Sequence, residues 1–544
     1  MKRLLFFMIV SLWMFECALA QSTWAEQTLS QLSLDEKIGQ LLMIDVQASK
    51  FEASEAYRVF TKKLITDYHV GSIIVFKNSP EKQVSMTNKL QAIAKYPLLI
   101  GQDCEWGLSM RLENTVRFPK NMTLGAIQNE SVIYDVGKEI GKHCRAIGVH
   151  INFAPVLDIN SNPDNPIIGV RSFGSDKYAV ARKSILFSQG LEAGAVLACA
   201  KHFPGHGDTS VDSHKDLPVI SHTYDRLMLE ELYPFTELIQ AGVSAVMTAH
   251  LSIPALDQTA NQPSTLSHKI VTDLLRKKLN FNGLIVTDAM NMKGVSNFYT
   301  PGQASLKALL AGNDLIIMPL DVPEVIKSIK QALADSVMTV QELDEHVMRV
   351  LQAKERVGIH ENRFVNETSM RSVIDSEYAR KLKRELYEQA ITVVRDEQHL
   401  LPIKNSKRVG IVHVGGHHDE QLDAISASYL QISPTPTAKE ITLVMEMLDE
   451  YEEIVVVLYA IDKSMGFFGR VDSISEQLEH ILERMILSHK KICVLACMSP
   501  YCLKFLKHLK TVVMAYENDF DAYQAALRVI FGNITPTGKL PIVI

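Results

Sequence analysis

AVLACAKH, residues 195–202, shows the pattern that decides the fold, because an apolar run ends here in two polar residues. Similar apolar runs recur between residues 41 and 319, with charged, helix-like stretches between them. A continuous apolar run is typical of a strand that is buried on both faces of a parallel sheet. We therefore expect eight strands, at Leu41–Val46, Gly71–Phe76, Leu98–Asp103, His150–Asp158, Ala195–His202, Ala245–His250, Leu284–Asp288 and Leu315–Pro319.

Strands that alternate with helices fit two α/β architectures, a closed (β/α)8 barrel and an open, doubly wound sheet. The positions of the polar residues distinguish the closed barrel from the open sheet. In a barrel, the catalytic groups stand at the carboxyl ends of several different strands. The sequence therefore predicts a TIM-like (β/α)8 catalytic barrel over residues 21–360, because polar residues follow several of its strands: Asp103, Asp158, Lys201, His202, His250 and Asp288.

A second block of strand-like and helical segments follows the barrel. A polar stretch around Glu361–Ser376 predicts a linker, which we place at residues 361–385. Gly415-Gly416 lacks the GxGxxG pattern of a dinucleotide site, so no cofactor is expected. A smaller, Rossmann-like α/β sandwich over residues 386–544 is predicted from five further apolar runs, at Ala390–Arg395, Arg408–Val414, Ile454–Tyr459, Ile492–Cys497 and Val512–Tyr516.

Residues 1–20 have the pattern of a secretory signal peptide, with two basic residues, an apolar run and the site Ala18-Leu19-Ala20. Cleavage before Gln21 would export the chain to the periplasm or the medium, with no transmembrane span left. An uncleaved anchor is the alternative, although the apolar run is short for a bilayer. The formal net charge of −6 disfavours nucleic acids and anionic membranes as partners.

Six cysteines follow the predicted signal peptide, and they are scattered along the chain. They form no tight array of the kind that binds a metal. In a large exported protein, we expect them to be buried thiols that pack as small hydrophobic groups, and not a disulfide framework.

Residues 201–218, KHFPGHGDTSVDSHKDLP, carry most of the chemical information. Three histidines and three aspartates in one segment need polar partners, so this segment is expected to be a loop over a pocket at a strand end. A purely structural interpretation, in which these groups cap one another, explains poorly why they coincide with other strand-end carboxylates.

A metal site is a second interpretation of this loop. Pro204 and Gly205 argue against it, because they interrupt the helix that would place two histidines on one face. We therefore predict no metal, although zinc could in principle be held by His202, His206, Asp208 and Asp288.

Acid–base catalysis is the third interpretation. Asp212 and His214 are two residues apart and would point the same way in an extended loop, so the carboxylate can hold one ring nitrogen and leave the other free. Histidine titrates near neutral pH and can protonate a leaving group and then deprotonate water. Asp288, at the end of the seventh strand, could attack an anomeric carbon and form a covalent glycosyl-enzyme, which is the retaining route.

KHFPGHGDTSVDSH resembles the signature of the β-N-acetylglucosaminidase branch of glycoside hydrolase family 3. The stretches APVLDINSNPDNPIIGVRSFGSD, VMTAHLSIPALD and LIVTDAMNMKGV resemble further family segments in the same order, and the ending ALRVIFGNITPTGKLPIVI resembles the end of the family's second domain. The resemblance covers nearly the whole chain after the predicted signal peptide.

The resemblance implies a role for each matching residue. Asp288 matches the family nucleophile, His214 the acid/base and Asp212 the carboxylate that orients it. The expected sugar-binding residues are Asp103, Arg111, Arg171, Lys201 and His202.

The chain departs from the family pattern after Asp103, where Trp106 and Leu108 replace a glycine and an arginine. Trp106 could stack on a second sugar or could fill space in the loop. Asp158 and His250 are interpreted as structural supports. His417-His418 is interpreted as a solvated turn.

We therefore expect an exo-acting, retaining β-N-acetylglucosaminidase without cofactor or metal. Its substrate would be a small oligosaccharide, from cell-wall muropeptides or chitin-like glycans. A phosphorylase that uses the same site, and a sugar-binding protein on an inactive enzyme fold, are the alternatives. The sequence leaves the oligomeric state open.

Overall fold

The computed structural model describes residues 22–209, 216–404, 409–415, 428–459 and 474–543. Its first part is a parallel sheet of eight strands in the order β7-β6-β5-β4-β3-β2-β1-β8. A backbone bridge between Val286 and Leu315 brings β7 and β8 together and nearly closes the barrel. The strands are β1 (Leu42–Val46), β2 (Ser72–Val75), β3 (Leu99–Gln102), β4 (Ile151–Asn152), β5 (Leu197–Phe203), β6 (Ala245–Thr248), β7 (Leu284–Thr287) and β8 (Ile316–Ile317).

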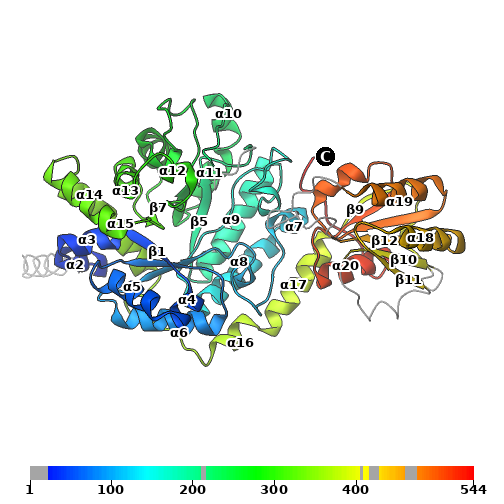
Figure 1. Ribbon diagram of the computed structural model, residues 1–544, viewed down its shortest axis with the longest axis horizontal. Helices are drawn as coiled ribbons and strands as arrows, with labels where there is room; N and C mark the ends of the chain where they lie inside the picture. The colour runs from blue at the N-terminus through cyan, green and yellow to red at the C-terminus, as the bar shows by residue number, and fades with distance from the viewer. Residues whose placement is uncertain (1–21, 210–215, 405–408, 416–427, 460–473, 544) are drawn as a thin grey trace, which may run out of the picture.

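The predicted barrel is therefore confirmed, and all eight expected runs contribute a strand. The strands are almost wholly buried because helices cover the outside of the barrel (Figure 1). The longer of these helices are α5 (Glu55–Thr66), α6 (Pro80–Ile93), α8 (Ser131–Ala146), α9 (Lys177–Ala193), α11 (Tyr233–Gln240), α13 (Pro301–Ala311), α14 (Val322–Ala334) and α15 (Val340–Arg356), with the π-helix η4 (Lys269–Lys278).

Local sequence signals set where many of these helices begin. Thr339 caps α15, and Glu342 completes a capping box by accepting a hydrogen bond from the Thr339 backbone. Proline stands in the first turn of α6, α11, α13 and α14, where its missing N–H leaves no intrahelical bond unmade. The remaining helices of this part are α2 (Trp24–Gln31), α3 (Leu34–Gln40), α4 (Ala48–Ala53), α7 (Asn121–Ala126), α10 (Tyr224–Leu229) and α12 (Lys293–Ser296).

Two helices connect the barrel to the second sheet. α16 (Met370–Ile374) and the first part of α17 (Glu377–Ala390) occupy the range predicted as a linker. α17 packs on α7 and α8 of the barrel and on α20 (Phe520–Ile530) of the second unit. Figure 1 shows this helix between the two parts.

The second unit is a six-stranded sheet in the order β11-β10-β12-β13-β14-β9. All strand pairs are parallel except β14 with β9. α20 covers one face, and α18 (Ala438–Glu450) and α19 (Glu476–Leu487) cover the other, so the predicted α/β sandwich is confirmed. The strands are β9 (Thr392–Asp396), β10 (Val409–Val414), β11 (Ser428–Ile432), β12 (Glu453–Leu458), β13 (Lys491–Ala496) and β14 (Thr511–Met514).

The end of the chain returns to the barrel. Lys539 N donates to Ala126 O at 2.9 Å, and Ser175 N donates to Pro541 O at 3.0 Å. Gly174 has φ +143°, and a Cβ at this position would lie 2.2 Å from Pro541 O, so only glycine permits this approach. The family-like ending GKLP therefore contributes to the contact between the two units.

The six cysteines of the described chain are all buried free thiols, as expected. A search of the described residues found no helix of the length and apolarity that a membrane span requires.

Candidate active site

A cavity of about 410 Å³ opens at the carboxyl ends of the barrel strands. Its lining includes both polar and apolar side chains, which suits the two kinds of surface that a sugar ring presents. The polar lining residues are Asp103, Arg111, Arg171, Lys201, His202, His206, Asp288 and Asn291. The apolar lining residues include Phe76, Met110, Phe153, Met247, Met292 and Met318.

Lys201, near the end of β5, lies at the centre of a buried charge network. Its Nζ is 2.9 Å from Asp103 Oδ1 and 3.0 Å from Glu105 Oε1. Arg111 Nη2 binds the other oxygen of Asp103 at 2.5 Å, and Arg171 Nη2 binds Glu105 at 2.7 Å. Three cations and two carboxylates are thereby held together, and all of them except Glu105 line the cavity.

The charges of this network are mutually stabilised. Burial alone would raise the pKa of Asp103, but Lys201 and Arg111 hold it well below its usual range. The pKa of Glu105 is lowered to about 2, because Arg171 and Lys201 outweigh burial. Burial would lower the pKa of Lys201, but Asp103 and Glu105 raise it. All of these groups are therefore charged near neutral pH.

Asp158 orients His202 and the turn that follows β5. His202 Nδ1 donates to Asp158 Oδ2 at 2.6 Å, and the His206 backbone N donates to Oδ1 at 2.6 Å. Gly207 lies so close to Ile159 O that a Cβ would approach it to 1.7 Å. The carboxylate and this close packing fix the ring of His202, whose Nε2 is 3.5 Å from Arg171 Nη2.

Asp288 follows β7 directly. Its backbone N donates to Thr248 O at 2.9 Å, and its Oδ1 accepts from Ala289 N at 2.7 Å. Burial would raise the pKa of Asp288, but His250, His202 and the Ala289 N–H lower it below its usual value. Asp288 is therefore a buried carboxylate that stays ionised and faces the cavity.

His250 supports the Asp288 turn from outside the cavity wall. Its Nε2 lies 3.1 Å from Ala289 O, and its Nδ1 lies 2.9 Å from Thr265 Oγ1. Neither His250 nor Asp158 is among the described lining residues, which agrees with their interpretation as structural supports.

The structure thus brings together six of the eight predicted site residues, all of which line the cavity: Asp103, Arg111, Arg171, Lys201, His202 and Asp288. Asp212 and His214 lie outside the described residues, as do the predicted signal peptide and His417-His418. The proposed acid/base pair therefore stays a prediction.

Glu105 is the residue whose role the sequence reasoning missed. It is almost fully buried and joins Arg171 to Lys201. The sequence does offer one indication of this role: Glu105 stands two positions after the predicted sugar-binding residue Asp103. Trp106 is also buried, with Lys120 Nζ 5.1 Å from its ring centroid, and is not among the described lining residues. The burial of Trp106 favours the interpretation that it fills space in the loop.

Comparison with known sequences identifies relatives along the whole chain. Beta-hexosaminidase A of Pseudoalteromonas piscicida is 28% identical over 596 aligned positions, which cover 96% of this chain and 99% of the relative. Beta-hexosaminidase LpqI of Mycobacterium tuberculosis is 31% identical over 335 positions, which cover 59% of this chain and 83% of the relative.

Among solved structures, a glycoside hydrolase family 3 β-N-acetylglucosaminidase from Paenibacillus sp. str. FPU-7 superposes with a TM-score of 0.79 and 32% identity. The match covers 94% of this chain and 99% of that chain. The family described as Glycosyl hydrolase family 3 N terminal domain matches residues 33–353, which is more than half of the sequence. This chain therefore belongs to glycosyl hydrolase family 3 and is a glycoside hydrolase.

Proposed function

We propose that the chain is an exo-acting, retaining β-N-acetylglucosaminidase of the β-hexosaminidase type. The observation that carries the proposal is the ionised, buried Asp288 in one cavity with the Lys201–Asp103–Glu105–Arg171 network. The relatives named as β-hexosaminidases and the β-N-acetylglucosaminidase structure support the choice of sugar.

In this proposal the charged wall binds the hydroxyl groups of one terminal sugar. Asp103 presents carboxylate oxygens to a diol, and Lys201 and Arg171 donate to further hydroxyls. A cavity of about 410 Å³ suits one sugar ring with part of its neighbour, which supports removal of terminal residues.

Asp288 would attack the anomeric carbon, forming its C–O bond as the bond to the leaving oxygen breaks. His214, oriented by Asp212, would give its proton to that oxygen. It would then take a proton from the water that hydrolyses the glycosyl-enzyme.

The test is hydrolysis of an aryl β-N-acetylglucosaminide by the wild type, Asp288→Ala and His214→Ala. We expect no measurable turnover for Asp288→Ala and strongly reduced turnover for His214→Ala. A fluorosugar that traps the covalent intermediate should label the peptide that contains Asp288. Unchanged turnover in Asp288→Ala would refute the proposal.

Products from muropeptides and from chitobiose, measured with and without phosphate, identify the substrate and the acceptor. We expect free N-acetylglucosamine under both conditions. The cationic side chains described in the cavity wall each contact a carboxylate, which favours water over phosphate as acceptor. A sugar 1-phosphate would instead establish the phosphorylase, and turnover of either substrate excludes the sugar-binding alternative.

The proposed place of action is outside the cytoplasm, where cell-wall glycans are accessible. The support is the signal-like pattern of residues 1–20. Amino-terminal sequencing of the mature protein should begin at Gln21. A mature chain that retains Met1 in the cytoplasm would contradict export.

A further inference from the structure

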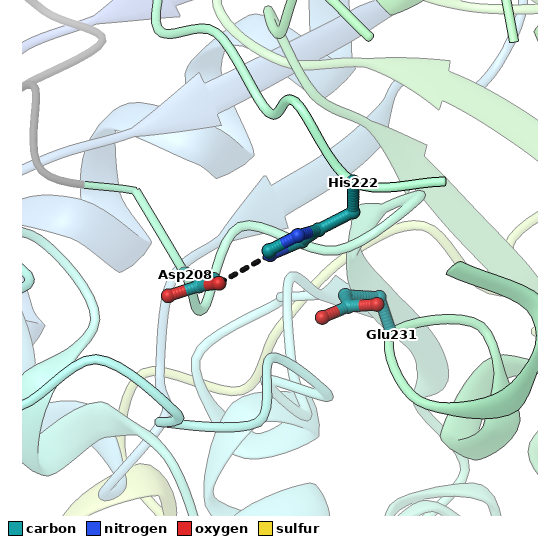
Figure 2. A group of neighbouring side chains, drawn as sticks. All are labelled: Asp208, His222 and Glu231. Atoms are coloured by element: carbon teal, nitrogen blue, oxygen red, sulfur yellow. Dashed lines mark hydrogen bonds and ion pairs between the residues drawn. The ribbon is translucent and has the colours of Figure 1, made fainter. Parts of the chain in front are cut away.

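A second cluster of polar residues lies beside the active site, on the chain that follows β5. Asp208 stands in the turn after β5, His222 precedes the cap of α10, and Glu231 lies between α10 and α11. One ligand-type atom from each of the three residues lies within 4.8 Å of the others. Figure 2 shows the imidazole of His222 bonded to Asp208, with the carboxyl group of Glu231 nearby.

The negative charge of this cluster is incompletely compensated. His222 Nε2 and Asp208 Oδ2 form a short hydrogen bond. Glu231 is only 6% exposed, and its Oε1 accepts from Arg226 Nη2 at 3.3 Å. Its Oε2 is buried and has no hydrogen-bond partner among the described residues. A buried carboxylate oxygen without a partner is costly, so Arg226 leaves part of the cluster's demand for a positive group unmet.

One imidazole nitrogen and two carboxylates are a donor set that binds divalent transition-metal ions, and three protein ligands with a water complete a tetrahedral site. We propose that Asp208, His222 and Glu231 form a binding site for a divalent cation of the Zn²⁺ class. Zinc bonds of about 2.0–2.2 Å place neighbouring ligand atoms about 3.3 Å apart, so small side-chain rotations close the present spacing.

Binding replaces the hydrogen bond between His222 and Asp208. The metal takes the lone pair of His222 Nε2, so this nitrogen must release any proton that it carries. The proton goes to solvent or to Nδ1, and the carboxylate oxygens of Asp208 and Glu231 then neutralise the metal charge. Zinc affinity should therefore fall as the pH is lowered.

Arg226 provides the counter-charge in the metal-free arrangement. Its Nη2 lies 3.3 Å from Glu231 Oε1 and 3.9 Å from Asp208 Oδ2, and its side chain is 42% exposed. The guanidinium can therefore turn into solvent when a cation binds. Because the two positive groups compete, removal of Arg226 should tighten metal binding, whereas removal of a ligand should weaken it.

The position of the site suggests an effect on activity. Asp208 precedes Asp212 by four residues, and His222 follows His214 by eight. A cation would tie together the two sides of the segment that carries the proposed acid/base pair, so occupancy is expected to change kcat. This consequence rests on the proposed function, whereas the binding site itself does not.

The experiment is calorimetric titration of the full, chelator-treated chain with ZnCl₂. We expect the wild type to bind one zinc ion, with affinity reduced about tenfold or more in His222→Gln and in Glu231→Gln. Arg226→Gln should bind zinc several-fold more tightly. His268→Asn is the matched control, because His268 also pairs with an aspartate, Asp273, but is exposed and outside the cluster.

Equal zinc affinity in the wild type, His222→Gln and Glu231→Gln would overturn the proposal, and so would Arg226→Gln binding no more tightly than the wild type. Arg226→Gln keeps all three ligands and changes an exposed side chain, so it tests the site even if a ligand variant fails to fold. The readout needs no substrate. An inactive enzyme that binds zinc as expected would contradict only the proposed function.

Discussion

Glu105 shows how one residue can act through its neighbours at the active site. It contacts Lys201 at 3.0 Å and Arg171 at 2.7 Å. Glu105→Gln keeps the shape but weakens both contacts, so the two cations lose their fixed positions. We expect kcat/KM for an aryl β-N-acetylglucosaminide to fall by up to about a hundredfold, mainly through KM.

The conservative change Glu105→Asp should restore part of this loss, because it retains the charge. Glu113→Gln is the matched control, since Glu113 is an exposed glutamate that only approaches Lys77 at 4.0 Å. An unchanged KM in Glu105→Gln would show that the cations hold their positions without it.

The same carboxylate makes stability depend on pH. The folded pKa of Glu105 is about 2, against an ordinary value of 4.5. The contribution of Glu105 to the free energy of unfolding is complete above pH 4.5. It is lost as the pH falls through the pKa of Glu105 in the folded chain, because the unfolded chain takes up the proton at a higher pH. We expect a loss on the order of 3 kcal/mol over this window.

Urea unfolding at several pH values between about 6 and about 2 measures this effect. The Glu105→Gln variant should show a shallower fall in the free energy of unfolding than the wild type. If the free energy of unfolding falls equally with pH in the two proteins, other carboxylates cause the loss of stability in acid.

At the scale of elements, Asp314 joins three segments at the amino-terminal end of β8. Its Oδ1 accepts from His346 and Arg349 of α15, and its Oδ2 accepts from Arg276 of η4 and from the Ile285 N–H of β7. Asp314→Asn removes the negative charge that Arg276 and Arg349 share. We expect a loss on the order of 3 kcal/mol in the free energy of unfolding.

Chemical denaturation measures the effect of Asp314→Asn. The control is Asp273→Asn on the same η4 helix, where the exposed pair with Lys277 should contribute less than about 1 kcal/mol. Equal effects of the two substitutions would contradict an anchoring role for Asp314.

The strands also show which elements can be predicted from the sequence and which cannot. Eight buried strands have continuous apolar runs, so all eight were found. β4 is much shorter than expected, because its regular pairing ends at Asn152. The chain then stays beside β5 through single hydrogen bonds from Cys199 N to Ala154 O and from Lys201 N to Pro155 O, and through a bridge between Val156 and Lys201. β11 was missed because it is a partly exposed edge strand, SYLQI, without a continuous apolar pattern.

At the scale of the whole molecule, Glu517 joins the second unit to the barrel. Its carboxylate accepts from the Lys120 backbone N and from Thr123 Oγ1, each at 2.7 Å, and from Arg117 Nη2 at 2.8 Å. Glu517→Ala leaves these donors without their acceptor, which weakens docking. We expect the second unit to unfold at a lower temperature than the barrel.

Differential scanning calorimetry should then show separated transitions for Glu517→Ala. Glu388→Ala is the control, because Glu388 pairs with Arg528 on a partly exposed surface and not across the contact between the two units. A transition as cooperative as that of the wild type would show that the returning carboxyl-terminal segment is sufficient for docking.

The sequence by itself determined the barrel, the sandwich and the strand ends that carry the site, because burial on both faces and polar strand ends leave local patterns. It also identified six of the cavity-lining residues through segments that resemble the family pattern. Only the tertiary structure determined which charged side chains contact one another. The contacts of Glu105, Asp158, Asp314 and Glu517 join residues far apart in the chain, and Asp208, His222 and Glu231 meet across loops between them. The energies of these contacts depend on distance and burial that no local pattern records.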